Sequence, residues 1–247
     1  MITVDLNCDL GEGFHNDEEL MAYISSANIA CGFHAGDFSA MSSTAAMAIK
    51  HGVAIGAHPA FPDKENFGRT IMNFSVQAVY ELMLYQMGAL HAIVTAHGKR
   101  LHHVKPHGAL YNMAAVNKEL SEAIVSAIFD FDSSLILYGL ANSEMIKAAK
   151  AKGILFQEEV FADRTYQPDG TLTPRSQPEA LIENTDTAIA QVLQMVKKKL
   201  VTATDGSLVR IQPDTICIHG DGAHAVEFAK AIHNKLKEEG IQISSSR

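Results

Sequence analysis

The sequence predicts an α/β fold in which parallel strands alternate with helices and close into a seven- or eight-stranded β/α barrel. Short apolar runs alternate with helix-like segments along all 247 residues, and this alternation is typical of a parallel sheet. No linker or change of composition interrupts the pattern, so we expect one domain over residues 1–247. Polar residues able to do chemistry follow nearly every strand, which favours a barrel over an open sheet with one switch point.

The strands are predicted from short apolar runs that end at glycine, proline or polar residues. In chain order, they cover residues 1–8, 27–31, 53–57, 101–107, 135–138, 154–161, 215–218 and 241–243. Asp205-Gly206 lies between two further β-type runs, so residues 201–209 are predicted to form a hairpin.

Helices are predicted between the strands, where apolar residues recur at helical spacing and capping residues mark the ends. They cover residues 16–25, 39–51, 75–97, 117–129, 142–152, 179–199 and 223–239. Gly52, Gly98 and Gly153 follow three of them, in the position of a C-terminal cap. Residues 164–175 hold two prolines and a glycine among few apolar positions, which indicates an excursion or a lid.

Composition excludes several classes of protein. The net charge is -8 and no basic run is long enough to follow a phosphate backbone, so nucleic acid is not an expected partner. No apolar stretch approaches the roughly 20 residues of a membrane helix, and the first residues lack the pattern of a signal peptide. The odd number of cysteines (Cys8, Cys31 and Cys217) indicates reduced, buried thiols in a cytoplasmic protein.

Polar residues occupy one face of the first predicted strand. Asp5, Asn7 and Asp9 alternate with apolar residues, and Glu12 follows directly. Three polar residues on one face of a buried strand are costly unless that face lines a site. We interpret Asp9 as a site residue, whereas Asp5 and Glu12 suit a site or a hydrogen-bonded structural role equally well.

Four histidines follow four different predicted strands: His34, His58, His107 and His219. A single histidine is more often structural, but in a parallel barrel these four and Asp9 converge on one mouth. Such a group can hold a divalent metal that activates water, or it can act as acid and base without metal. No Cys-x-x-Cys spacing occurs, so both alternatives stay open.

Further residues near the predicted mouth suit anions. Lys105 shares a strand face with His107, and a buried lysine must be paired or titrate with a lowered pKa. Arg69 can bind a carboxylate or a phosphate, and the turn His219-Gly220-Asp221-Gly222 opens a helix in a way that suits an anion. No Walker A pattern is present, so a nucleotide site must be of another kind or lie on another chain.

At these residues the chain resembles the LamB/YcsF family of lactam-utilisation proteins. The resemblance is carried by residues 5–13, 28–37, 56–59, 104–112, 161–164 and 218–221. It implies a distorted β/α barrel akin to those of polysaccharide deacetylases and glycoside hydrolases. It also implies ATP-dependent opening of 5-oxo-L-proline to L-glutamate, in a complex with the B and C subunits of 5-oxoprolinase. Phe38 and Ala60 depart from the family pattern, which affects loop shape and removes no ionisable group.

The positions of these residues suggest roles in that reaction. We hypothesise that Asp9 and His107 orient or deprotonate the attacking water. His34 and His58 would stabilise the oxyanion or hold a metal, and Lys105 would bind a carboxylate or a phosphate. The residues assigned to substrate binding are Asn7, Glu12, Arg69, Tyr111, His219 and Asp221. ATP is the expected cofactor, bound here or shared with the partner subunits. Two alternatives are a metal-dependent carbohydrate deacetylase and a non-catalytic substrate-binding or scaffold subunit.

Overall fold

The computed structural model describes residues 2–219 and 225–245, and within these ranges seven parallel strands form a closed ring. In chain order the strands are β1 (Thr3–Leu10), β2 (Ser26–Ala30), β3 (Ala54–His58), β4 (His103–Val104), β5 (Ile136–Leu140), β6 (Leu155–Phe161) and β9 (Thr215–Ile218). Strand β9 lies between β6 and β1 and closes the ring. A short strand, β10 (Gln242–Ile243), pairs with the first residues of β1. The predicted β/α barrel is confirmed.

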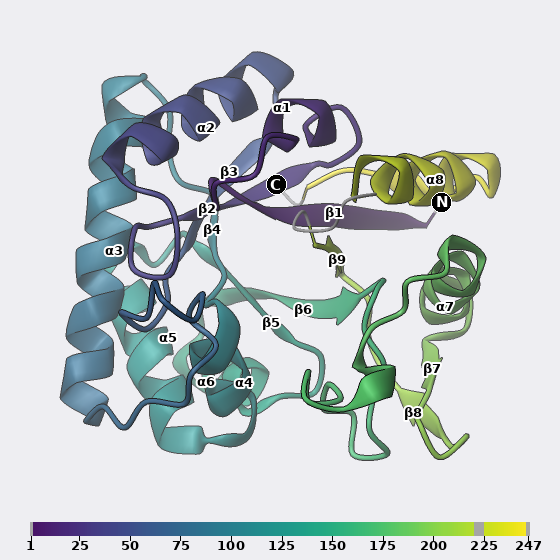
Figure 1. Cartoon of the computed structure of the whole chain (residues 1–247). Coiled ribbons are helices and arrows are strands. Elements are labelled where there is room, and N and C mark those ends of the chain that lie inside the picture. Colours follow the sequence, from purple (N-terminus) through teal and green to yellow (C-terminus); the bar gives the residue numbers. More distant parts are fainter. Residues whose placement is uncertain (1, 220–224, 246–247) are drawn as a thin grey trace.

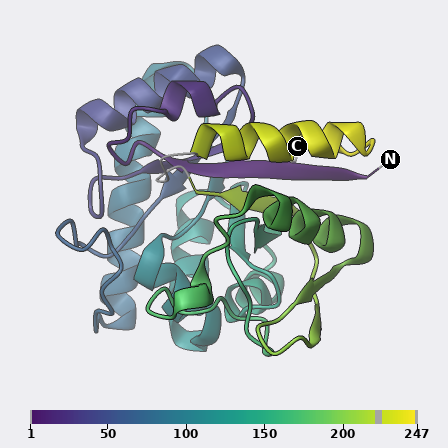
Figure 2. The same ribbon diagram turned by 45° about the vertical axis from the view of Figure 1, so that its right-hand side comes forward.

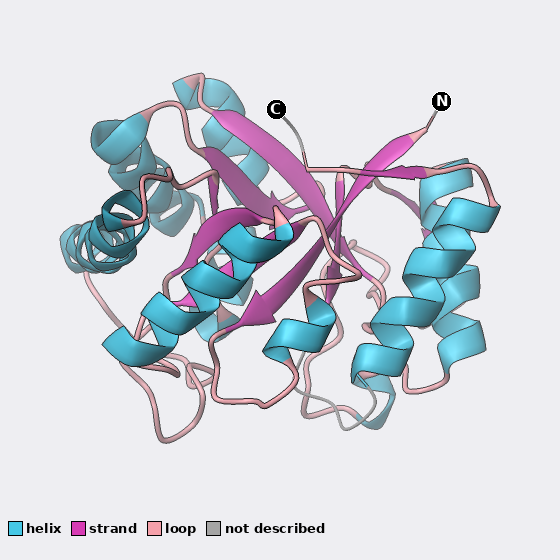
Figure 3. Ribbon diagram, turned by 90° about the horizontal axis from the view of Figure 1, so that it is seen from above, coloured by secondary structure: helices cyan, strands magenta, loops and turns pink. Residues whose placement is uncertain are grey.

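Helices surround the ring on all sides (Figures 1 and 3). Those within the described residues are α1 (Asp17–Leu20), α2 (Phe38–His51), α3 (Val76–Ala96), α4 (Gly108–Val116), α5 (Lys118–Asp132), α6 (Glu144–Lys152), α7 (Thr185–Lys198) and α8 (Ala225–Glu238), with a 3₁₀ turn, η1, at Pro178–Ala180. Figure 2 shows the C-terminal helix α8 running alongside β1. None of the described helices is long and apolar enough to cross a membrane.

The strands alternate between an apolar outer face and a polar inner face. On β1, Val4, Leu6 and Cys8 belong to the hydrophobic core that joins the ring to the helices. Asp5 and Asn7 lie on the opposite face, and both bond to Thr215 on the neighbouring strand β9. Because strands have a period of two, this alternation places Asp5, Asn7 and Asp9 on the face of β1 that points into the barrel.

Two predicted elements are shorter than expected. The predicted strand 101–107 is reduced to β4, because Pro106 has no N–H to donate to a ladder. The N–H groups of Lys105 and His107 still donate to the carbonyls of Ala57 and Pro59, so this segment continues along β3. The predicted helix 16–25 is also too long, since α1 ends at Leu20 and the chain turns toward β2.

Two helix starts also differ from the prediction. Helix α4 was not expected; it begins directly after His107, and Asn117 then separates it from α5. The helix predicted from residue 179 begins only at Thr185, because the side chain of Asn184 caps it by accepting from the N–H of Thr187.

The chain between β6 and α7 forms the predicted excursion. The guanidinium of Arg164 donates to the carbonyls of Thr173 and Ala180. The hydroxyl of Tyr166 accepts from the N–H of Phe161. These bonds fold the excursion back over the barrel mouth. The predicted hairpin is also present, as antiparallel strands β7 (Leu200–Thr202) and β8 (Leu208–Arg210).

Candidate active site

The carboxyl ends of the barrel strands surround one pocket of about 670 Å³. This volume is in the range of sites for small organic ligands. The ionisable side chains of interest that line the pocket are Asp9, Glu12, His58, Arg69, Lys105, His107, Tyr111, Arg164, Arg175 and His219. They come from the ends of four strands of the ring (β1, β3, β4 and β9), from the loop after β3, from α4 and from the excursion, so the fold assembles the pocket from segments far apart in sequence.

Lys105 is the centre of a buried charge network. Its Nζ lies 2.9 Å from both Asp9 Oδ1 and Glu159 Oε1, and 3.0 Å from Cys217 Sγ. Burial alone would lower the pKa of Lys105, but Asp9, Cys217 and Glu159 outweigh this effect and hold the pKa well above its usual value. Lys105 is therefore a buried cation that stays charged at neutral pH.

The side chains of Asn7, Asn28 and His103 form a hydrogen-bonded layer next to this network. Asn28 Nδ2 donates to Asn7 Oδ1 at 2.7 Å and to Asp9 Oδ1 at 2.8 Å. His103 Nε2 in turn donates to Asn28 Oδ1 at 2.7 Å. The ring of His103 fits only because residue 56 is glycine: a Cβ there would lie 2.1 Å from His103 Nε2. The layer fixes the orientation of the Asp9 carboxylate.

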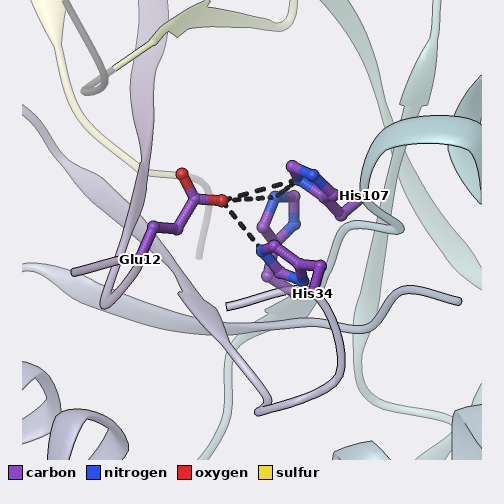
Figure 4. A group of neighbouring side chains, drawn as sticks. Glu12, His34 and His107 are labelled. Carbon is purple, nitrogen blue, oxygen red and sulfur yellow. Dashed lines mark hydrogen bonds and ion pairs between the residues drawn. The ribbon is translucent and has the colours of Figure 1, made fainter. Parts of the chain in front are cut away.

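Three histidines gather around one oxygen of Glu12, two of them labelled in Figure 4. Glu12 Oε1 lies 2.9 Å from His34 Nε2, 3.5 Å from His107 Nδ1 and 3.8 Å from His58 Nε2. The rings of His34 and His107 stack with their centroids 3.8 Å apart. One donor atom from each of the four residues lies within 4.8 Å of the others, so the group has the composition and spacing of a metal site.

Main-chain carbonyls orient two of these imidazoles. His58 Nδ1 donates to the carbonyl of Lys105 at 2.7 Å, and His107 Nε2 donates to that of Phe67 at 2.9 Å. Phe67 and Gly68 both have left-handed backbone, with φ values of 57° and 67°. A Cβ on residue 68 would lie 2.9 Å from His107 Cδ2, so this turn requires glycine.

A further group of pocket residues combines polar pairs with a guanidinium. His219 Nδ1 donates to Asp163 Oδ2 at 2.7 Å, and Arg175 donates to His219 Nε2 at 3.1 Å. Tyr111 donates its hydroxyl proton to Glu159 Oε2 at 2.6 Å. Arg175 therefore adds a positive charge beside His219 in the lining of the pocket.

Burial and charge separate the protonation states of the site residues. Burial alone would raise the pKa of Asp9, but His58 and Lys105 hold it well below its usual value. Burial, reinforced by the neighbouring histidines, lowers the pKa of His34 and of His107 well below the usual value. At neutral pH the site thus holds an ionised carboxylate beside neutral imidazoles, a combination able to accept protons or bind a cation.

The structure brings most of the predicted site residues together. Those that line the pocket are Asp9, Glu12, His58, Arg69, Lys105, His107, Tyr111 and His219. Asn7 and His34 are buried directly behind this lining. Arg69 holds its guanidinium 4.9 Å from the centre of the Phe67 ring. Asp221 lies outside the described residues.

Three residues of the site were missed by sequence reasoning. Glu159 binds Lys105, and Cys217 contacts the same ammonium. Strand alternation could have found both, because each lies on a predicted strand at an inward-facing position. Arg175 carries no such signal, since its position depends on how the excursion folds.

The comparisons with known proteins agree with this geometry. The sequence profile of the LamB/YcsF family matches residues 4–247. The chain belongs to the LamB/YcsF family. It is 55% identical over 251 residues to the A subunit of 5-oxoprolinase from Geobacillus thermodenitrificans (strain NG80-2), and the match covers 100% of this chain and 98% of that protein.

Solved structures extend the comparison to the fold of this LamB/YcsF protein. The lactam utilization protein from Thermus thermophilus superposes with a TM-score of 0.93 at 40% identity, covering 99% of this chain and 100% of that one. A family 4 carbohydrate esterase from Streptomyces lividans superposes with a TM-score of 0.54 at 11% identity, covering 98% and 92%. The second likeness concerns the fold alone, and it agrees with the predicted deacetylase-like barrel.

Proposed function

We propose that this LamB/YcsF protein is the A subunit of an ATP-dependent 5-oxoprolinase, which opens the lactam of 5-oxo-L-proline to give L-glutamate. The observation that carries the proposal is the 55% identity, over the whole chain, to a protein of that name. The expected partners are the B and C subunits, and ATP is bound by this chain or shared with them. The pocket supports the proposal because it pairs proton acceptors with cationic groups.

The chemistry of the substrate explains why ATP is needed. A five-membered lactam is a stable amide, and its hydrolysis at neutral pH requires coupling to a favourable reaction. Transfer of a phosphoryl group from ATP to the amide oxygen makes the carbonyl carbon electrophilic. Water then adds to that carbon, and the ring C–N bond breaks as the nitrogen takes a proton, which leaves an acyl phosphate. A second water hydrolyses the acyl phosphate to L-glutamate and inorganic phosphate. The protein must supply a base for the water and positive charge near the oxygens, where negative charge develops.

Asp9 is the residue that we assign to accept the proton of the attacking water. Its Oδ1 is engaged by Lys105 and Asn28, whereas Oδ2 lies 3.3 Å from His58 Nε2 on the pocket side of the network. The carboxylate stays ionised because its pKa is held well below the usual range. Lys105 adds positive charge beside the reacting carbonyl, where the oxyanion develops.

The cationic groups of the pocket suit the carboxylate of 5-oxoproline. Arg69 and Arg175 both line the pocket, and a guanidinium can bind a carboxylate with two parallel hydrogen bonds. His219 orients Arg175 by accepting one of its protons, and Asp163 fixes His219 in turn. Binding there would direct the lactam ring toward Asp9 and the histidines.

The test is glutamate release from 5-oxoproline, with and without ATP, by this chain alone and together with its B and C partners. We expect ATP-dependent release only from the full set. Asp9→Asn and His107→Asn should abolish release in the full set, whereas His91→Gln, on the outer helix α3, should leave it unchanged. Urea unfolding of each variant checks that the chain still folds.

Two other outcomes of the assay would contradict this proposal. Release that survives both site substitutions would support a non-catalytic, substrate-binding or scaffold subunit. Absence of release under all conditions would refute the 5-oxoprolinase assignment.

A further inference from the structure

The hydrogen bonds of His58 and His107 leave two ring nitrogens facing each other at the pocket wall. His58 Nδ1 and His107 Nε2 each bond to a main-chain carbonyl. A carbonyl only accepts, so both of these nitrogens carry a proton. The other nitrogen of each ring, His58 Nε2 or His107 Nδ1, is a lone pair unless it also carries a proton. These two nitrogens face one another at 2.9 Å, so a positive charge, either a proton or a bound cation, is needed between them.

Two lone pairs at hydrogen-bond distance repel unless a positive charge lies between them. The main-chain contacts hold both rings in this arrangement, and the one at Phe67 requires a left-handed backbone that a bulky residue rarely adopts. The turn at Phe67 and Gly68 therefore positions His107 at a cost in backbone energy. This arrangement is understandable if the facing nitrogens bind a common cation.

Glu12 supplies a third donor at a matching distance. Its Oε1 lies 3.5 Å from His107 Nδ1 and 3.8 Å from His58 Nε2. Three atoms separated by 2.9, 3.5 and 3.8 Å lie on a circle with a radius of about 2.0 Å, which equals the bond length from zinc to an imidazole nitrogen or a carboxylate oxygen. An ion near the centre of that circle would bind all three atoms without any side chain moving.

The surroundings of the three donors are those of an open metal site. Glu12, His58 and His107 all line the pocket, which leaves one side of the ion accessible to water or substrate. His34 lies behind the lining and contacts Glu12 Oε1 through Nε2 at 2.9 Å, so it orients the carboxylate. Bonding of the distal imidazole nitrogens to main-chain carbonyls is also the usual arrangement for metal-binding histidines.

The geometry points to a divalent transition-metal site, of the kind that takes Zn²⁺, formed by His58 Nε2, His107 Nδ1 and Glu12 Oε1 at the wall of the pocket. Imidazole and carboxylate ligands together suit first-row ions rather than Ca²⁺ or Mg²⁺. When bound, such an ion polarises a carbonyl or phosphoryl oxygen and lowers the pKa of a coordinated water. Asp9 lies beside the site, with Oδ2 3.3 Å from His58 Nε2, and can take the proton of that water.

The test measures binding and needs no activity. The chain alone is stripped with a chelator, titrated with Zn²⁺ by calorimetry, and its metal content is measured after desalting. We expect one tightly bound ion per chain. His58→Gln, His107→Gln and Glu12→Gln should each weaken binding by tenfold or more, and His34→Gln should weaken it less. His91→Gln, a partly exposed histidine on α3, is the control for surface binding and should leave binding unchanged.

Thermal unfolding keeps the test informative if a variant is destabilised. Zn²⁺ should raise the unfolding midpoint of the wild-type chain, as any ligand of the folded state does, and it should not do so for the three ligand variants. Binding that is absent, or equal in wild type and variants, would overturn the proposal and leave a shared proton between the two rings. The glutamate assay is independent: activity of a metal-free complex would refute this site while sparing the proposed function.

Discussion

Replacing Lys105 with methionine removes the buried cation and keeps most of the side-chain volume. Asp9 and Glu159, each 2.9 Å from the ammonium, would then remain buried without that cation, and Asp9 would keep His58 as a neighbour at 3.3 Å. Removing one partner of a buried ion pair costs about 3–5 kcal/mol. In a chain of this size each kcal/mol lowers the unfolding midpoint by about 2–4 °C, so the expected fall is roughly 6–20 °C.

The pH dependence of the variant gives a second signature. Without the ammonium, burial raises the pKa of Asp9 above the low value that it has in the wild-type protein. The folded variant then binds more protons than the folded wild type as the pH falls, so it loses less stability in acid. The gap in stability between wild type and Lys105→Met should therefore narrow as the pH falls.

Urea unfolding at several pH values measures both effects, and the chain offers a matched control. Lys147 also pairs with a carboxylate, Glu144, at 2.6 Å, but its side chain is 67% exposed. Lys147→Met should therefore cost less than about 1 kcal/mol. If Lys105→Met lost as little stability as this control, and the gap did not depend on pH, the buried network would not hold the fold as argued.

Two further predictions concern the stability of the fold at low pH and the turn beside the histidines. The pKa of Asp9 in the folded protein lies below its ordinary value of 3.8, so the ionised carboxylate stabilises the fold fully above that pH. This stabilisation is lost as the pH falls through the folded pKa. The difference in free energy of unfolding between wild type and Asp9→Asn, measured with urea, should therefore shrink below about pH 4. Gly68→Ala places a Cβ 2.7 Å from His34 and 2.9 Å from His107, so it should weaken both Zn²⁺ binding and turnover. Gly98→Ala, with the same left-handed backbone but no atom within 4 Å, should destabilise the fold by about 1–2 kcal/mol and leave both functions intact.

Much of the fold could be predicted from the sequence, because the apolar runs and the helix caps are local signals. Helix α2 illustrates this: the side chain of Asp37 accepts from the first N–H groups, and Gly52 ends the helix with a φ of 70°. The failures occurred where tertiary contacts override local preference. The segment Lys105–His107 was predicted as a regular strand, but it follows β3 through isolated main-chain bonds around Pro106.

The sequence predicted most residues of the candidate site, but fewer of the contacts between them. Asp9 and the histidines could be identified because they lie at the ends of predicted strands, and parallel strands bring such side chains to one mouth of a barrel. The role of Glu12 was not evident, because it depends on where two loops, carrying His34 and Phe67, fold against each other. Those distances are set by long-range packing, which spacing along the chain does not encode.

Two carboxylates on one strand show how partners, rather than position, decide chemistry. Asp5 and Asp9 lie on the same inner face of β1, and both are buried. Asp5 accepts hydrogen bonds from three hydroxyl groups, those of Ser25, Ser26 and Thr215. Burial outweighs these neutral donors and raises the pKa of Asp5. Asp9 faces Lys105 and His58 instead, and its pKa falls. When two similar groups have environments that shift their pKa values in opposite directions, the two groups can have different roles. We therefore assign Asp5 a structural role inside the barrel, and Asp9 the role of the ionised group available to a substrate.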